Sequence, residues 1–478
     1  MKNRIILAML LVGASAPAIS ADFGTSADQL LESQSLPLFG IAKPLAASAP
    51  QSAEKGYRIP ASTESDTIAL ADGLTAKYLT REAADKWDMM TFYPADKPTH
   101  LIACIEGDRE EIAPGKFNPA VQRVSLADGK VETIVRGTAS CDGIRTTAWG
   151  TILFTEEDDL GGAYEMIDPL NVKDIVIKDR ATGETSDATK VVRRMALPTM
   201  AWEGIAVLPN GVVYSGDELR PGTDAANADG GAMFKFIPAA PFAGGMIDAL
   251  DKSPFAAGKT YAMQVSCVKD KVQVGQGCET GMAGWVEVDP TRVRAEANEK
   301  LATGYYRPED LHQDIAYRGA GVRFCFTNTG NEGARNFAEV MCAVDEKPLE
   351  IPVADAEGKI KFFTEVNRFI EGDADFNSFD NLDFQPGSGN LYVIEDHPNG
   401  DIFACLPDGA DRNVKSDGCI KVLSVKDSSA EPTGFVFSPD GTQAYVAIQH
   451  SNDDAMAKVD DYGTDDILVI SGFAQVTQ

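Results

Sequence analysis

Basic residues and histidines are scarce in this 478-residue sequence. It holds 43 Lys and Arg against 72 Asp and Glu, so its formal net charge is −29 at pH 7. This balance argues against nucleic acid or an anionic membrane surface as the partner. There are only four histidines, and none has HExxH or another strong metal-ligand spacing. The histidines therefore offer no rival metal site with a recognised ligand spacing.

Long apolar runs are absent after the N-terminus. The chain begins MKNRIILAMLLVGASAPAISA, in which Lys2 and Arg4 precede an apolar run that is too short to span a bilayer. We interpret residues 1–21 as a signal peptide without a twin arginine. We therefore expect an exported protein without a transmembrane helix, located in the periplasm, at the cell surface or outside the cell.

The eight cysteines are candidates for disulfides, because an exported chain meets an oxidising environment. Three pairs are close enough in sequence to staple local loops or hairpins, and the other two cysteines are Cys104 and Cys141. The three local pairs are Cys267 with Cys278, Cys325 with Cys342, and Cys405 with Cys419.

A single pattern recurs along most of the chain. An acid precedes a run of alternating apolar residues, a Pro/Gly/Asn/Asp turn follows, and a second β-rich run ends in more polar or acidic residues. Helical signals are few. Irregular recurrence over several tens of residues is typical of a β-propeller with inserted loops. The six copies span residues 87–108, 141–159, 202–218, 307–328, 378–400 and 431–450.

The domain organisation follows from this pattern. Residues 22–66 are rich in Ala, Ser and Pro, and we expect an N-terminal arm or linker with a short helix around residues 26–34. Residues 67–478 should form one all-β domain, a six-bladed β-propeller with inserted loops and short helices. A helix is expected in residues 291–303.

The acids of the pattern should gather at one mouth of the propeller, because the inner strands all run the same way. Like charges brought so close need counter-charge, and bound cations would supply it. Oxygen ligands favour calcium, and a nearby thiolate would admit a transition metal. The plainer alternative is that the acids merely end strands. The hairpin starts carry Asp88, Asp142, Glu203, Glu309, Asp380 and Glu431, and the ends carry Glu106, Glu156, Glu157, Asp217, Glu218, Glu395, Asp396 and His450.

The segment CDGIRTTAWGTILFTEED, beginning at Cys141, resembles the Cys-Gly-Trp-Gly-Thr-Glu-Glu segment of PhoX-type alkaline phosphatases. WEGIAVLPNGVVYSGDE, GGAMFKFIP, YYRPEDL, FDNLDFQPGSGNLYVIED and EPTGFVFSPDG resemble later motifs of that family in the same order. The resemblance runs from about Tyr57 to the neighbourhood of His450. It implies a six-bladed propeller that hydrolyses phosphate monoesters at a cluster of calcium and iron.

The resemblance also implies roles for individual residues. Arg307 matches an arginine that contacts phosphate, and its planar fork suits two phosphate oxygens. Glu309 serves in catalysis and also in the metal cluster. The predicted metal ligands are Cys141, Glu156, Glu157, Glu203, Asp217, Glu218, Glu309, Asp380, Glu395, Asp396 and Glu431.

Some features depart from the family pattern and leave alternatives open. Cys141 either ligates iron or forms a disulfide with Cys104, and the disulfide would remove the thiolate. The chain is either an exported calcium-dependent phosphatase, or a surface-layer-like structural protein that self-assembles through calcium, with or without phosphatase activity. A third alternative is a substrate-binding propeller that has lost catalysis.

Overall fold

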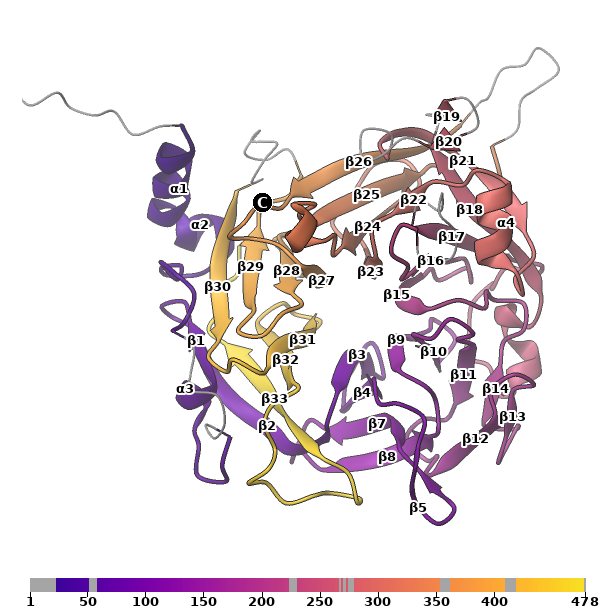
Figure 1. Cartoon of the computed structure of the whole chain (residues 1–478), viewed down its shortest axis with the longest axis horizontal. Coiled ribbons are helices and arrows are strands. Elements are labelled where there is room, and N and C mark those ends of the chain that lie inside the picture. The colour runs from indigo at the N-terminus through magenta and orange to yellow at the C-terminus, as the bar shows by residue number, and fades with distance from the viewer. Residues whose placement is uncertain are drawn as a thin grey trace, which may run out of the picture.

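The structure is a computed structural model that describes residues 23–50, 58–222, 230–265, 268–269, 272–273, 279–352, 362–408 and 418–476. The predicted signal peptide and the predicted pairing of Cys267 with Cys278 lie outside these residues. The chain is mostly β, and its sheets stand radially around a common axis (Figure 1). The predicted all-β propeller class is confirmed.

Six strands of the described residues lie innermost, and each contacts the next around a closed ring. We call each inner strand, together with the strands that extend outward from it, a unit. Hydrogen bonds join the β15 and β23 units through β21 (Gly281–Val288) into one ten-stranded sheet, so the count of six separate blades stays a prediction. The inner strands are β3 (Trp87–Tyr93), β9 (Cys141–Thr146), β15 (Trp202–Val207), β23 (Pro308–Gln313), β27 (Phe379–Phe384) and β31 (Glu431–Phe437).

The strands outward from each inner strand are mainly antiparallel neighbours, as expected for hairpins joined by short turns. In the β3 unit they are β4 (His100–Ile105), β7 (Pro119–Ser125), β8 (Val131–Arg136), β12 (Ile175–Asp179) and β13 (Glu184–Thr185). In the β9 unit they are β10 (Thr151–Glu156), β11 (Ala163–Ile167) and β14 (Val191–Arg193). In the β15 unit they are β16 (Val213–Asp217), β17 (Gly231–Pro238) and β18 (Gly258–Val265).

The other three units follow the same plan. Their outward strands are β24 (Val322–Asn328), β25 (Glu339–Asp345) and β26 (Thr364–Glu371); β28 (Leu391–Glu395), β29 (Asp401–Cys405), β30 (Cys419–Val425) and β1 (Ile68–Leu70); and β32 (Gln443–Gln449), β33 (Thr464–Ser471) and β2 (Thr75–Ala84). Short additional strands are β5 (Glu111–Ala113), β6 (Lys116–Phe117), β19 (Val268–Lys269), β20 (Val272–Gln273) and β22 (Gly304–Tyr305).

The apolar core lies between neighbouring units. Alternating side chains of one sheet pack against those of the next, and one such cluster joins the β3 and β9 units through Met89, Ile102, Ile144 and Phe154. Two disulfides cross-link paired residues on adjacent strands, which confirms the predicted pairs. They are Cys325–Cys342 and Cys405–Cys419.

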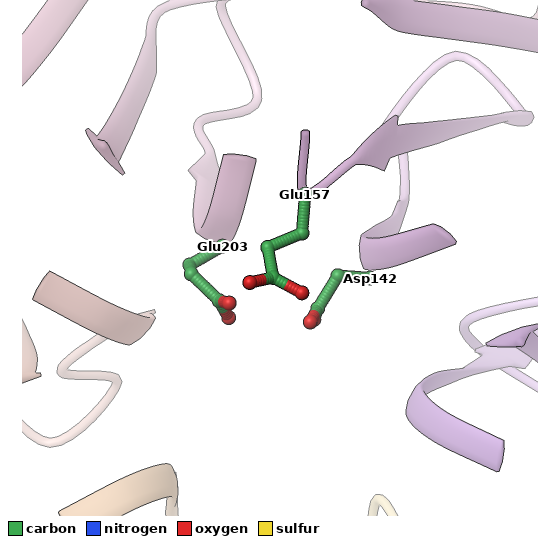
Figure 2. A group of neighbouring side chains, drawn as sticks. All are labelled: Asp142, Glu157 and Glu203. Carbon is green, nitrogen blue, oxygen red and sulfur yellow. The ribbon is translucent and has the colours of Figure 1, made fainter. Parts of the chain in front are cut away.

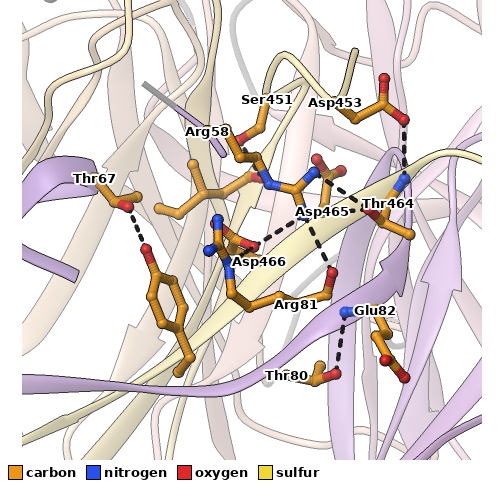
Figure 3. Close-up of polar contacts among 12 residues, drawn as sticks. Arg58, Thr67, Thr80, Arg81, Glu82, Ser451, Asp453, Thr464, Asp465 and Asp466 are labelled. Carbon is orange, nitrogen blue, oxygen red and sulfur yellow. Dashed lines mark hydrogen bonds and ion pairs between the residues drawn. The ribbon is translucent and has the colours of Figure 1, made fainter. Parts of the chain in front are cut away.

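Strands from both ends of the chain close the ring. β2 pairs with β33 in the last unit, and β1 pairs with β30 in the unit before it. Arg58 is fully buried beside this closure, and its Nη2 lies 2.9 Å from Asp466 Oδ1. Arg81 Nε lies 3.0 Å from the same oxygen, and Figure 3 shows the three side chains together. The N-terminal part of the chain therefore fixes the C-terminal unit.

The short helices lie outside the ring. Helix α1 (Phe23–Ser33) and helix α2 (Ser35–Phe39) precede α3 (Glu64–Thr67), and α4 (Val293–Glu299) confirms the predicted inserted helix. The described part of the expected arm packs onto the propeller, because Phe39 and Ile41 are buried against the β27 and β31 units. Single turns of 3₁₀ helix cover Leu250–Lys252, Pro254–Ala256 and Glu332–Ala334. Among the described residues, no helix combines the length and apolarity needed to cross a membrane.

Candidate metal centre

A register shift at the start of the inner strand places an acid at the axis in five units. In the β15 unit, Trp202 pairs with Asp217 and the regular pairing resumes at Ile205, so Glu203 falls inside the bulge. A bulge re-aims a side chain in this way. The same position holds an acid in the β3, β9, β23 and β27 units. We call the five acids the inner ring: Asp88, Asp142, Glu203, Glu309 and Asp380.

Two groups of carboxylates are close enough to share a cation. Asp142, Glu157 and Glu203 each offer an oxygen within 4.8 Å of the others, and Glu203, Glu309 and Asp380 do the same. Figure 2 shows the first group, with its carboxylates directed toward one another. Glu203 belongs to both groups, so two cations could lie side by side with this residue between them.

The acids of these groups are buried or half-buried without enough positive charge. Asp142 is 3% exposed, and its Oδ1 has no hydrogen-bond partner. Burial, and then the charges of neighbouring acids, raise the pKa of Asp142, Glu157 and Glu203 well above their ordinary values. An unpartnered buried carboxylate oxygen is costly. A hard divalent cation would satisfy it, so the residues present fit calcium.

The acids that end the second strand of a hairpin accept hydrogen bonds from nearby loops, unlike the acids that follow them. Glu156 Oε1 accepts hydrogen bonds from Ala139 N at 3.0 Å and Arg180 Nε at 2.7 Å, and its Oε2 accepts one from Gly162 N at 3.0 Å. Both oxygens of this carboxylate are therefore occupied. These hydrogen bonds fix the loop before β9, and Glu156 belongs to neither carboxylate group, so its metal-binding role stays a prediction.

Asp217 and Glu395 repeat this arrangement in two other units. Asp217 accepts a hydrogen bond from Ala201 N at 3.1 Å and forms an ion pair with Arg294 at 2.7 Å. Glu395 accepts hydrogen bonds from Asn377 N and Asp401 N, both at 3.0 Å. Both oxygens of each carboxylate therefore accept hydrogen bonds from the protein, and neither residue belongs to the two carboxylate groups; their metal-binding role stays a prediction.

The residue after each of these acids lies nearer the mouth. Glu157 joins the first carboxylate group, while Glu218 and Asp396 lie beside Arg307. The sequence predicted all three as ligands without separating them from their structural neighbours. The hydrogen bonds of the preceding acids distinguish the two sets.

Arg307 brings positive charge to the mouth. Its Nη2 lies 3.1 Å from Glu309 Oε1 and 3.7 Å from Asp396 Oδ2, and its Nε pairs with Glu218. Burial raises the pKa of Glu309 to about 8, although Arg307 opposes the rise. Three carboxylates thus orient the guanidinium at the edge of the carboxylate cluster, where it can meet an anion.

The β31 unit departs from the inner ring. Its register shift follows Thr433, so Gly434 takes the position that is acidic in the other five units. A side chain there would collide with Asp88, because a Cβ on Gly434 would lie 2.3 Å from Asp88 O. The predicted ligand Glu431 lies two residues before Thr433 and pairs with His450 at 3.3 Å, and its metal-binding role stays a prediction. The inner ring is therefore incomplete on this side.

Cys141 forms a disulfide with Cys104, so the alternative left open by the sequence is resolved in favour of the pair. Both cysteines are fully buried, and neither carboxylate group includes a sulfur ligand. A disulfide sulfur is not a thiolate, so the implied iron ligand does not fit this structure.

A second layer of charges beside the inner ring was not predicted. Asp310 Oδ1 lies 2.9 Å from Arg145 Nη2, and Asp310 Oδ2 lies 3.2 Å from His312 Nε2. His312 Nδ1 in turn lies 3.3 Å from Asp383 Oδ1. Burial opposes ionisation of Asp310, but the charges of His312 and Arg145 hold its pKa below the ordinary value. The adjacent acids Glu309 and Asp310, which face opposite ways along the strand, were the available signal.

Comparison with known proteins decides the family. The model of the alkaline phosphatase PhoX family matches residues 109–452, which is most of the chain. The chain belongs to the PhoX family. The predicted resemblance is thereby confirmed, and the carboxylate groups and Arg307 all lie within the matched part of this PhoX-family protein.

Solved structures show only a distant likeness to this PhoX-family chain. A luciferin-regenerating enzyme is 10% identical with a TM-score of 0.42, covering 85% of this chain and 99% of its own. The PQQ-bound aldose sugar dehydrogenase from Streptomyces coelicolor is 11% identical with a TM-score of 0.40, covering 84% and 99%. The WD40 β-propeller domain of Doa1 is 11% identical with a TM-score of 0.37, covering 83% and 97%. These scores carry no functional argument, and no curated protein matches the chain.

Proposed function

We propose that this protein is an exported, calcium-dependent phosphatase that hydrolyses phosphate monoesters at the mouth of the propeller. One observation carries the proposal. Two carboxylate groups share Glu203, and Arg307 lies 3.1 Å from Glu309 at the edge of the second group. Membership of the PhoX family supports the phosphatase class.

Each part of the mouth suits one part of the reaction. Asp142, Glu157 and Glu203 would hold one calcium ion, and Glu203, Glu309 and Asp380 a second. When bound, the cations neutralise the phosphate dianion and stabilise the charge that reaches the leaving alcohol.

The protein's own groups prepare this site. Arg307 can donate two parallel N–H bonds to phosphate oxygens, which fixes the orientation of the ester. Glu218 and Asp396 keep its guanidinium at the mouth before substrate arrives. Thr329 donates a hydrogen bond from Oγ1 to Glu309 and thereby holds that carboxylate in place.

Export is part of the proposal. Three disulfides among the described residues agree with an oxidising compartment, and the N-terminal sequence has the form of a signal peptide. Calcium is abundant in such compartments, so the carboxylate groups would meet their cation there.

The direct test is hydrolysis of a chromogenic phosphate monoester by the mature protein, in calcium and after treatment with a chelator. We expect the chelator to abolish turnover and calcium to restore it. Arg307→Lys keeps the charge but loses the fork, so we expect kcat/KM to fall by about 100-fold, within the range for lost transition-state contacts. Full activity in chelator would contradict the proposal.

Glu299→Gln serves as a matched control, because this exposed glutamate lies on α4 and not at the mouth. It should leave turnover unchanged. If the native protein binds calcium but hydrolyses no monoester, the binding-propeller alternative would replace the enzyme. No contact among the described residues favours the surface-layer alternative, and calcium-dependent sheets in electron micrographs would be needed to support it.

A further inference from the structure

The bond between Cys104 and Cys141 lies directly beside the carboxylate groups. Cys141 is the first residue of β9, and the next residue is Asp142, one of the proposed calcium ligands. Cys104 lies in β4, two residues before Glu106. The disulfide therefore ties together the ends of two strands from neighbouring units.

The two side chains at the start of β9 point in different directions. Cys141 belongs to the apolar cluster between the β3 and β9 units, which also contains Met89 and Phe154. Asp142 falls inside the bulge, and Figure 2 shows its carboxylate directed toward those of Glu157 and Glu203, while Cys141 packs in the core. In the disulfide, the sulfur of Cys141 therefore lies in this apolar cluster and belongs to neither carboxylate group.

The equivalent residues of two other units indicate the same core position for Cys141. Cys141 pairs with Glu156, just as Trp202 pairs with Asp217 and Phe379 with Glu395. Trp202 and Phe379 are fully buried core residues. Cys141 thus occupies the register position that large core side chains fill elsewhere, and the disulfide packs that position.

We propose that the Cys104–Cys141 disulfide is a positioning cross-link of the core, so that the mouth binds hard divalent cations through oxygen atoms alone and holds no sulfur-ligated iron. This inference rests on the proposed function for the presence of a metal centre. It differs from the ligand set that the family resemblance implies, because Cys141 is placed outside that set.

The donor chemistry agrees with this assignment. Both carboxylate groups consist of Asp and Glu only, and no His or Cys of the described residues belongs to either group. Oxygen-only sites suit calcium, magnesium or manganese, whereas thiolates select softer metals. The cross-link fixes the backbone at Asp142 without taking a coordination position.

The first test uses the native protein, without substrate. Peptide mapping under non-reducing conditions should recover the peptide containing Cys104 joined to the peptide containing Cys141. Metal analysis of the protein after exposure to both calcium and iron salts should find calcium and only traces of iron. Stoichiometric iron together with an alkylatable Cys141 would overturn the inference.

The second test compares Cys104→Ser with Cys141→Ser. Both variants lose the same cross-link, so we expect calcium affinity, measured by calorimetry, to fall equally in both, by about 10- to 100-fold, as for other residues that orient ligands. Adding iron to Cys104→Ser, which frees the Cys141 thiol, should produce no sulfur-to-iron absorption band. A much larger loss of metal in Cys141→Ser than in Cys104→Ser, or appearance of that band, would show that Cys141 is a ligand.

These measurements separate the inference from the proposed function. If the native protein has the disulfide and binds calcium without hydrolysing a monoester, the function is wrong and the cross-link assignment stands. If it hydrolyses monoesters only with iron bound at Cys141, the function survives and the cross-link assignment is wrong. If neither variant folds, the mapping and metal content of the native protein still decide the question.

Discussion

Replacing Glu203 by glutamine should change the calcium-free and calcium-bound proteins in opposite directions. Glu203 is 4% exposed and contributes to both carboxylate groups, in each of which the oxygens lie within 4.8 Å of one another. At that distance, two full negative charges repel by about 3.5 kcal/mol in an effective dielectric constant of about 20. Glutamine keeps the shape of the side chain and removes its charge.

The calcium-free protein should become more stable. The raised pKa values of Glu203 and Asp142 mean that protons already relieve part of the repulsion, so we expect a gain of about 2–4 kcal/mol. For a chain of 478 residues this corresponds to a rise in melting temperature of about 2–4 °C. Calcium affinity should fall by more than about 100-fold, or about 2.7 kcal/mol, because both sites lose a ligand.

Thermal unfolding in chelator and in excess calcium, together with calorimetric titration, measures both effects. Glu156→Gln is the matched control, because this buried glutamate is occupied by hydrogen bonds from backbone and Arg180. It should destabilise both forms by about 1–3 kcal/mol and leave calcium affinity within tenfold. Native calcium affinity in Glu203→Gln would contradict its proposed place in both sites. A calcium-free form destabilised like that of the control would contradict the expected relief of charge repulsion.

Three further predictions concern pH and buried ion pairs. The pKa of Glu309 is raised to about 8, so the calcium-free folded state holds a proton that the unfolded state releases above about pH 4.5. The stability of the calcium-free protein should therefore fall as pH rises from about 4.5 to about 8, while its calcium affinity should rise. Urea unfolding and calcium titrations across that pH range would measure both effects. Arg294→Ala leaves Asp217 buried without its partner and should lower the free energy of unfolding in urea by about 3–5 kcal/mol; an unchanged unfolding midpoint would contradict this. Arg58→Met should lower the free energy of unfolding by about 3 kcal/mol, because among the described residues only Arg81 would then pair with Asp466. Proteases should also cut the chain faster at the ring closure, and an unchanged proteolysis rate would contradict this.

The sequence was sufficient to predict the propeller class, because alternation, turns and recurring acids are local signals. It was also sufficient to predict that Glu203, Glu309 and Asp380 gather, since equivalent positions of repeated hairpins meet at one axis. It could not distinguish Glu156 from Glu157. That difference depends on which backbone N–H groups approach each carboxylate, and the groups that bind Glu156 come from the loops on either side of its hairpin, at Ala139 and Gly162.

The β31 unit and the cysteines show the same limit. The pattern aligned Glu431 with the other acids, whereas the register shift places Gly434 at the inner ring. A register shift is a property of two paired strands, so it is not visible in one of them. The pairing of Cys104 with Cys141 likewise depended on contact between two units, which the spacing of the two residues left open.

The sharing of the last unit between both ends of the chain determines when the mouth can exist. β31 pairs with β32, but its sheet is complete only when β33 (Thr464–Ser471) pairs with both β32 and β2. A chain that crosses a membrane unfolded would therefore reach the far side before its carboxylates meet. Cation binding would then follow completed export. The metals present where the ring closes would determine which metal is bound, and those present where the chain is made would not.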